Sequence, residues 1–180
     1  EALYAGFQLY TDLDQQLKAF ELAAEKDPNC ARAFNNIGYV KIMQGELDDA
    51  QEALEKANDL MDGSPHILNN LGVIELMRGN TDDAKAHFMD ATDAGDAVDY
   101  NLGIVNIIQG DYEAAINYLQ GKESFNAALA MLLGGKQGNA QNTLEQIEDK
   151  SAKNHYLMAV IAARNNNQEE VFKNLRTAIE

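Results

Sequence analysis

The sequence predicts an all-α fold built from repeated helical hairpins, and three observations support that prediction. Small and apolar residues return at a fixed interval, apolar residues recur at helical spacing, and the chain has 46% hydrophobic residues with only 2 Pro in 180. The matched pairs are Gly38 and Gly72, Gly45 and Gly79, Ala50 and Ala84, Leu54 and Phe88, and Ala57 and Ala91. A constant period of about 34 residues predicts stacked units, each burying its apolar face against a neighbour.

The stretch from 31 to 64 shows what one unit contains. We expect a first helix over about 33–43 and a second over about 47–60, because apolar residues share one face in each. Gly38 and Ala50 are small, so the two helices can approach closely there. Gly45 can take the left-handed conformation that ends a helix. The acidic residues that follow it lie at the positive end of the second helix, which favours them.

This pattern resembles the tetratricopeptide repeat, a helix-turn-helix unit of about 34 residues. The family order is a large apolar residue, a Leu-Gly pair, a turn Gly, then Ala, a large apolar residue and Ala. Two stretches of this chain match that order: Phe34, Ile37, Gly38, Gly45, Ala50, Leu54 and Ala57, and then Leu68, Leu71, Gly72, Gly79, Ala84, Phe88 and Ala91. The resemblance implies a right-handed α-α superhelix, a tetratricopeptide-like solenoid of about six helix-turn-helix repeats.

The remaining repeats follow from the same spacing. We expect a single solenoid with repeats at about 1–30, 31–64, 65–95, 96–123, 124–151 and 152–180. Counting back places Phe20 and Ala23 in the second helix of the first repeat, and Asp27-Pro28-Asn29 in its closing turn. The first repeat starts partway in and the last lacks a polar capping helix, so we expect a fragment of a longer chain.

The period shortens toward the C-terminus. Fewer residues separate Gly79 from Gly110 than separate Gly45 from Gly79. After Gly110, the best match to the repeat pattern has two equal steps that are shorter again, the first from Gly110 to Gly138 and the second from Gly138 to Asn166. We therefore expect shorter second helices in the last repeats, and we place Gly134-Gly135 within a helix. The final helix, at about 168–179, is expected to bury Val171, Leu175 and Ala178.

Composition excludes several classes of function. The net charge of −15, from 14 Lys and Arg against 29 Asp and Glu, opposes binding to nucleic acids and anionic membranes. No apolar run approaches the ~18–20 residues that a membrane-spanning helix needs. One cysteine, Cys30, forms no internal disulfide and says little about compartment. The sequence is compatible with the cytoplasm and with a bacterial periplasm or envelope.

No enzyme motif is apparent. His66, His87 and His155 lie in different repeats without a metal-ligand neighbour at helical spacing, and Cys30 has no nearby His. No phosphate-binding Gly loop is found. The sequence therefore predicts a non-catalytic protein with no cofactor and no metal.

In the tetratricopeptide repeat family, the first helices line a concave groove, and the resemblance implies the partner-binding residues here. They are Asn35, Tyr39, Met43, Asn69, Val73, Met77, Tyr100, Ile104, Ile107, Ile108, Leu132, Tyr156 and Val160. The same rule places Arg32, Asn36, His66, Asn70 and Asn101 on lining positions. The Asn side chains either bind an extended peptide backbone or stabilise the hairpins. The apolar side chains of the C-terminal half form either a contact surface or part of the core.

We predict a protein–protein interaction scaffold that binds a peptide or protein partner on the concave face. The alternatives are a regulatory or substrate-docking arm of a larger enzyme, and a structural component of a bacterial envelope assembly. Chaperone C-terminal tails are not expected as partners. The clamp that binds them in this family needs Lys and Asn in one repeat and Lys and Arg two repeats later, and this chain has Asn35, Tyr39, Ala97 and Asn101 in those slots. Stacking of adjacent repeats is also expected to pair Lys41 with Glu75.

Overall fold

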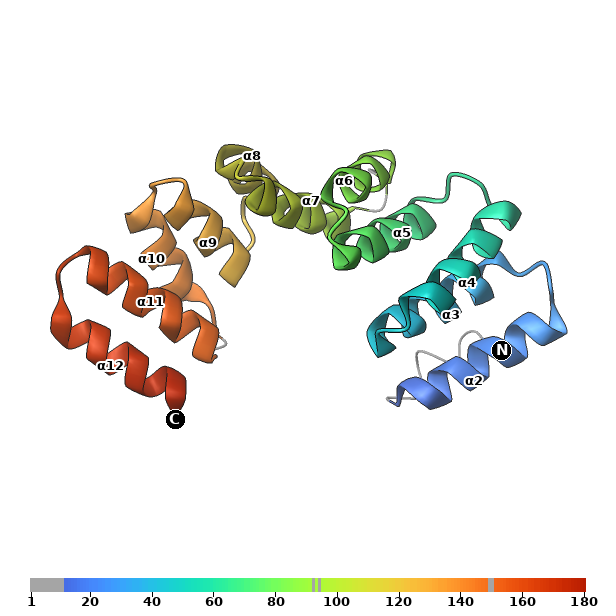
Figure 1. The fold of residues 1–180 in the computed structure, drawn as a ribbon, viewed down its shortest axis with the longest axis horizontal. Helices are drawn as coiled ribbons and strands as arrows, with labels where there is room; N and C mark the ends of the chain where they lie inside the picture. The colour runs from blue at the N-terminus through green and yellow to red at the C-terminus, as the bar shows by residue number, and fades with distance from the viewer. Residues whose placement is uncertain (1–11, 92, 94, 149–150) are drawn as a thin grey trace. The chain divides into compact units, whose positions relative to one another are not determined.

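The computed structural model describes residues 12–91, 93, 95–148 and 151–180. In this part of the chain it has eleven α-helices and no strand (Figure 1), which confirms the predicted all-α helical-repeat fold. The helices are α2 (Leu13–Lys26), α3 (Ala31–Gln44), α4 (Leu47–Leu60), α5 (Pro65–Arg78), α6 (Thr81–Asp90), α7 (Asp96–Gln109), α8 (Tyr112–Tyr118), α9 (Phe125–Leu133), α10 (Gln137–Gln146), α11 (Ala152–Arg164) and α12 (Gln168–Ile179). The first helix predicted for the first repeat falls largely outside the described residues.

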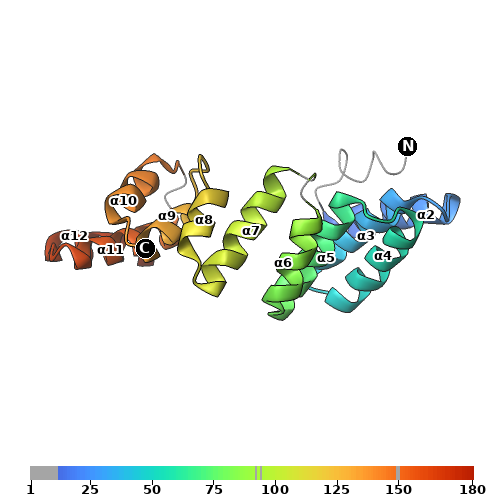
Figure 2. The same ribbon diagram turned by 90° about the horizontal axis from the view of Figure 1, so that it is seen from above.

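The chain forms two compact units, residues 1–101 and 102–180, with the boundary inside α7. In unit 1, α3 pairs with α4 and α5 with α6, and Figures 1 and 2 both show α5 and α6 side by side. In unit 2, α9 pairs with α10 and α11 with α12. The core of unit 1 contains Ile42, Ala50, Leu54, Ala57, Ile67 and Ile74. The core of unit 2 contains Ala128, Leu132, Ala140, Leu144, Ile147, Leu157 and Ile161.

A glycine in the first helix of a hairpin lies directly under a large side chain of the second helix. A methyl group added to Gly38 would lie 2.5 Å from Leu54 Cγ, and one added to Gly72 would lie 2.6 Å from Phe88 Cε1. Gly103 repeats the arrangement at 2.5 Å from Leu119 Cγ. These distances are too short for any side chain, so the close approach predicted at Gly38 is confirmed, and it recurs in two further hairpins.

The turn between the two helices of each hairpin is also repeated. The residue in the left-handed conformation is Gly45, Gly79, Gly110, Gly135 or Asn166, with φ values of 80°, 86°, 81°, 79° and 57°. In the first of these turns Gly45 N–H donates to Ile42 O at 3.0 Å and Glu46 N–H donates to Lys41 O at 2.9 Å. The other four turns have the same two bonds. This is the Schellman motif, which satisfies carbonyl groups left unpaired at the end of a helix.

These turns correct the predicted spacing of the last repeats. Within the hairpin after the one that turns at Gly110, the left-handed turn residue is Gly135, and Gly138 lies inside α10. A short step from Gly110 to Gly135 and a long step from Gly135 to Asn166 therefore replace the two equal steps. The predicted helix across Gly134-Gly135 is also wrong, because α9 ends at Leu133. The shortening is shared between α8, with 7 residues, and α9, with 9, where α3 has 14. The step length found in the sequence is therefore the mean of two unequal steps in the structure, from Gly110 to Gly135 and from Gly135 to Asn166.

The final helix is less buried than predicted. Val171, Leu175 and Ala178 are only half-buried, and Asn174 is the buried residue of α12. The Asn174 amide donates to Glu170 O at 2.9 Å, and its oxygen lies 3.2 Å from His155 Nδ1. The amide therefore joins α12 to α11 through polar contacts, whereas the residues equivalent to Leu175 in the earlier hairpins are buried.

Polar side chains bridge the two helices within a hairpin and do not pair as predicted. Lys41 forms ion pairs with Glu46 and Asp49 at the start of α4, and Glu75 contacts Arg78 at 3.5 Å and Asn80 at 2.7 Å. The predicted Lys41–Glu75 pair is therefore wrong. Lys41 and Glu75 each contact residues on the far side of the turn that follows their helix, because the second helix of the same hairpin starts beside them. The hydrogen bond with Glu46 is the main cause that raises the pKa of Lys41.

Other polar contacts join one hairpin to the next. Gln44 donates to Asp14 at 2.8 Å, and Arg78, at the equivalent position of the following hairpin, pairs with Asp48 at 2.6 Å. In unit 2, Gln137 donates to Asn165 at 2.6 Å. In each case one partner lies at or just after the C-terminal end of the first helix of a hairpin. The other partner lies in the first turn of the second helix of the hairpin before it.

Paired substitutions test the corrected turn. Gly135→Ala forces an alanine into the left-handed region, so we expect it to lower the free energy of unfolding by about 1 kcal/mol. Gly138 lies in a helix, and apart from its chain neighbours and the nearby backbone of that helix no atom lies within 4 Å of a methyl group added there. We therefore expect Gly138→Ala to raise the free energy of unfolding by about 0.5 kcal/mol. Urea unfolding followed by circular dichroism measures both. If Gly138→Ala lowered the free energy of unfolding and Gly135→Ala raised it, the turn would lie at Gly138, as the sequence spacing predicted.

A double-mutant cycle tests the ion pairs. Lys41→Ala with Glu46→Ala should give a coupling of about 0.5–1 kcal/mol in the free energy of unfolding at pH 7, because both charges are near the surface. Lys41→Ala with Glu75→Ala should give none. Folding raises the pKa of Lys41, so the stabilisation is complete below the unfolded pKa and is lost as the pH rises through the folded one.

Candidate functional site

Two adjoining hollows lie along the first helices of unit 1, α3 and α5. One has a volume of about 360 Å³ and the other about 170 Å³, and both are lined by Asn35, Asn36 and His66. The larger is also lined by Ala31, Arg32, Met61, Ser64 and Ile67, and the smaller by Tyr39, Asn69 and Asn70. We call the two hollows together the unit 1 groove. Equivalent positions of two successive hairpins form it because α3 and α5 lie next to each other.

The lining of the unit 1 groove has an unusual charge for this chain. Acidic residues outnumber Lys and Arg by 29 to 14 in the sequence, but the residues that line the groove include no Asp or Glu. The side chains that can carry charge there are Arg32 and His66, the second residues of α3 and α5, together with the Tyr39 hydroxyl. The groove is therefore a neutral-to-basic surface on an acidic protein.

Amide side chains form a hydrogen-bonded ladder along the groove. Asn70 Nδ2 donates to Asn35 Oδ1 at 3.0 Å, and Asn101 Nδ2 donates to Asn69 Oδ1 at 2.9 Å. Asn35 in turn donates to Asn36 at 3.3 Å. Each bond across hairpins joins first helices that follow one another in the stack, so the ladder ties them together. An amide nitrogen has two N–H groups, so each donor retains a second one for a ligand.

Exposed apolar side chains continue the same face. Met43 is 56% exposed and Met77 is 53% exposed, at equivalent positions in the last turns of α3 and α5. Tyr39 is exposed, while Asn69 and Val73 are half-buried. Of the residues predicted to bind a partner, the groove brings together Asn35, Tyr39 and Asn69. Tyr100 is half-buried in α7.

The residues of unit 2 that the sequence predicted to bind a partner differ in their exposure. Ile108 and Tyr156 are exposed, and Ile104, Ile107 and Val160 are half-buried. Leu132 is only 2% exposed and belongs to the core, so it does not line a surface as predicted. The misplaced turn explains the difference, because the corrected spacing makes Leu132 equivalent to the buried Ile42. The residue equivalent to the exposed Ile108 is Leu133, which is exposed. The corrected spacing also makes Asn126 the equivalent of Asn101, which the predicted spacing missed.

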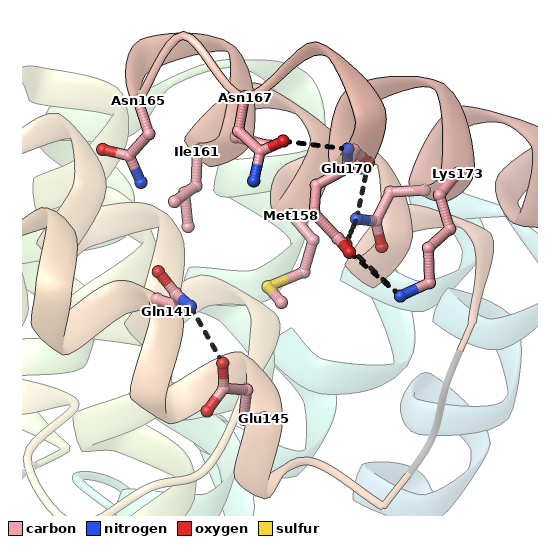
Figure 3. A pocket seen from close by; sticks show the side chains of 10 residues that line it. Gln141, Glu145, Met158, Ile161, Asn165, Asn167, Glu170 and Lys173 are labelled. Atoms are coloured by element: carbon pink, nitrogen blue, oxygen red, sulfur yellow. Dashed lines mark hydrogen bonds and ion pairs between the residues drawn. The ribbon is translucent and has the colours of Figure 1, made fainter.

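One hollow of unit 2, which we call the unit 2 hollow, has a volume of about 380 Å³ and lies between α10, α11 and α12. Figure 3 shows Gln141 and Glu145 of α10 on one side, Glu170 and Lys173 of α12 on the other, and Met158 of α11 between them. Its charged groups are already paired, since Lys173 contacts Glu170 at 3.1 Å and Gln141 donates to Glu145 at 3.0 Å. It is less suited to a ligand than the unit 1 groove.

The described residues contain no group of three or more His, Cys, Asp or Glu side chains that could hold a metal ion. Among residues 12–91, 93, 95–148 and 151–180, none of the helices combines the length and apolar character needed to span a membrane.

Comparisons with known proteins agree with the repeat architecture. The tetratricopeptide repeat family model matches residues 31–60, and similar solved structures are tetratricopeptide repeat proteins, which confirms the resemblance found in the sequence. No curated protein matches the sequence. Repeat proteins of this fold generally act as non-catalytic scaffolds for protein–protein interaction.

Three solved structures show how far the fold similarity extends. PilW, a widely conserved type IV pilus biogenesis factor, has a TM-score of 0.81 at 22% identity, with 99% of this chain and 95% of that chain covered. PilF of Pseudomonas aeruginosa has a TM-score of 0.79 at 17% identity, with 96% and 86% covered. YrrB, a tetratricopeptide repeat protein with an unusual peptide-binding site, has a TM-score of 0.67 at 23% identity, with 91% and 92% covered.

Substitution of Asn35 tests the structural part of the amide ladder. Asn35→Ala removes the acceptor for Asn70 and the donor for Asn36 and leaves two half-buried amides unpaired, so we expect the free energy of unfolding to fall by about 1 kcal/mol. Asn139→Ala, at an exposed position of α10, is the matched control and should change it by less than about 0.5 kcal/mol. Equal effects in urea unfolding would show that the ladder does not stabilise the stack.

Proposed function

We propose that this tetratricopeptide-like chain is a non-catalytic scaffold that binds an extended segment of a partner protein in the unit 1 groove. The observation that carries the proposal is the groove itself, two adjoining hollows with a shared amide lining along α3 and α5. The fold class supports it, since such repeats generally mediate protein–protein interaction.

The chemistry of the lining suits a polypeptide backbone. An extended segment presents N–H and C=O groups that need partners when they leave water. Side-chain amides both donate and accept hydrogen bonds, and Asn35, Asn36, Asn69 and Asn70 line the groove in pairs from two successive hairpins. Because the ladder already orders these amides, binding would cost little further side-chain entropy.

Apolar side chains beside the amides would supply binding energy. Tyr39, Met43 and Met77 are exposed on the same first helices. Methionine is flexible and polarisable, so it can adapt to apolar side chains of different shape. In unit 2, Ile104, Ile107, Ile108, Tyr156 and Val160 remain proposed as a separate contact surface for a partner, and Leu132 is withdrawn because it is buried.

A peptide selection tests the proposal. Random peptides of about a dozen residues displayed on phage would be selected on the whole chain, and the best binder would be synthesised and titrated by fluorescence anisotropy. We expect Tyr39→Ala combined with Met43→Ser and Met77→Ser to weaken its binding by at least about tenfold, because three exposed contact side chains are removed together.

The control is Met89→Ala, which removes an equally exposed methionine from the second helix α6. It should leave the affinity unchanged within about twofold. Failure to select any peptide, or equal loss in the control, would contradict binding in the unit 1 groove.

A second candidate function is a structural part of a bacterial envelope assembly. The supporting observation is that the similarity to PilW covers nearly the whole of both chains rather than a shared repeat or two. Deletion of the gene in the source organism, followed by electron microscopy of surface pili, tests it. Unchanged pili on the deletion strain, or a source without pili, would remove the pilus version of this candidate.

A further inference from the structure

We infer that the partner segment places an acidic side chain, Asp or Glu, at the end of the unit 1 groove that is lined by Arg32 and His66. This inference rests on the proposed function and adds the chemical class of the segment. Both side chains line the same hollow of about 360 Å³, and both are exposed. They are the second residues of α3 and α5, equivalent positions of successive hairpins, so stacking brings them to one end of the groove.

Charge complementarity identifies the occupant. No Asp or Glu lines either hollow of the groove, although the chain has 29 acidic residues. The unit 2 hollow, in contrast, is lined by Glu145 and Glu170 as well as Lys173. A ligand carboxylate in the unit 1 groove therefore meets a guanidinium and an imidazole without meeting a carboxylate of the lining. A guanidinium in particular presents several N–H groups in a plane that matches a carboxylate.

The helix starts around the hollow strengthen this positive character. α3 and α5 have no acidic residue in their first turns, and neither cap residue, Cys30 or Ser64, makes a side-chain capping bond. The second helices of unit 1 are different, since α4 begins with Asp48 and Asp49 and α6 with Asp82 and Asp83. The partial positive charge of two helix N-termini therefore adds to the charge of Arg32 rather than being offset by acids in the first turn.

The arrangement favours a side-chain carboxylate over the C-terminal carboxylate of a peptide. The hollow lined by Arg32 continues into the second hollow past Asn35 and Asn36, so a segment can extend along the groove beyond its acidic residue. We therefore commit to an internal Asp or Glu, with neutral or apolar residues following it toward Tyr39 and Met43.

The experiment uses the same phage selection, in which peptides are joined to the coat protein through their C-terminus and have no free terminal carboxylate. We expect the selected peptides to share one Asp or Glu at a fixed position. This result is informative because a chain of net charge −15 would otherwise favour basic peptides. Replacing that residue by Asn or Gln in the synthetic peptide should weaken binding about five- to twentyfold.

A matched pair of protein variants locates the contact. The double variant Arg32→Gln, His66→Gln should lower the affinity for the acidic peptide by the same five- to twentyfold. It should lower the affinity for the neutral counterpart of that peptide by less than twofold. Lys18→Gln with Lys26→Gln, on exposed positions of α2 outside the groove, is the control and should change both by less than twofold. Equal losses for both peptides, or equal losses in the control, would overturn the assignment.

The two proposals fail in different ways. Selected peptides that bind the groove, lose affinity in the Tyr39, Met43 and Met77 variant, and contain no shared acid would overturn the inference and leave the scaffold proposal standing. A synthetic neutral peptide can be compared with a free C-terminal carboxylate and with a C-terminal amide. If the free carboxylate binds more tightly and the gain depends on Arg32 and His66, the groove binds a terminal carboxylate and not a side-chain carboxylate, and the inference is wrong. If no peptide is selected, both proposals fail together.

Discussion

The contact between a small residue of the first helix and a large residue of the second helix determines the geometry of the hairpins α3–α4, α5–α6 and α7–α8. At Gly38, Gly72 and Gly103 the space for a side chain is already filled by Leu54, Phe88 and Leu119. Two helices that touch through a glycine lie closer than two that touch through larger residues. In α9 the equivalent residue is Ala128, which shares a core with Leu144, so the small residue is retained where the Leu-Gly pair is lost.

The repeated turn fixes the direction in which each hairpin closes. A Schellman motif ends the first helix and leaves the first residues of the second helix beside the last turn of the first. Lys41 and Glu75 use this proximity, and each reaches a partner across its own turn. The contacts between hairpins come from Gln44 and Arg78 instead.

The groove of unit 1 follows from the same regularity. Because α3 and α5 present equivalent positions next to each other, one residue type repeated in the sequence becomes a row in space. Asparagine repeated at two adjacent positions gives the hydrogen-bonded ladder, methionine gives an exposed apolar edge, and a basic residue at the second helical position gives a positive end. A scaffold built this way can present amide, apolar and basic surfaces to different parts of one extended segment.

The sequence by itself determined the fold class, the approximate bounds of the two helices in the 31–64 repeat and the left-handed turn at Gly45, because a constant period with glycine at the same positions admits few other structures. It also placed the Asn side chains on the first helices. Only the tertiary structure decided which glycine forms the fourth of the five described turns, because Gly135 and Gly138 both fit a sequence match and only the length of α9 separates them. The same shift of register buried Leu132 and exposed Leu133. The pairing of Lys41 with Glu46, and the absence of acids from the groove, likewise depend on which side chains meet across helices, and a one-dimensional pattern does not contain those distances.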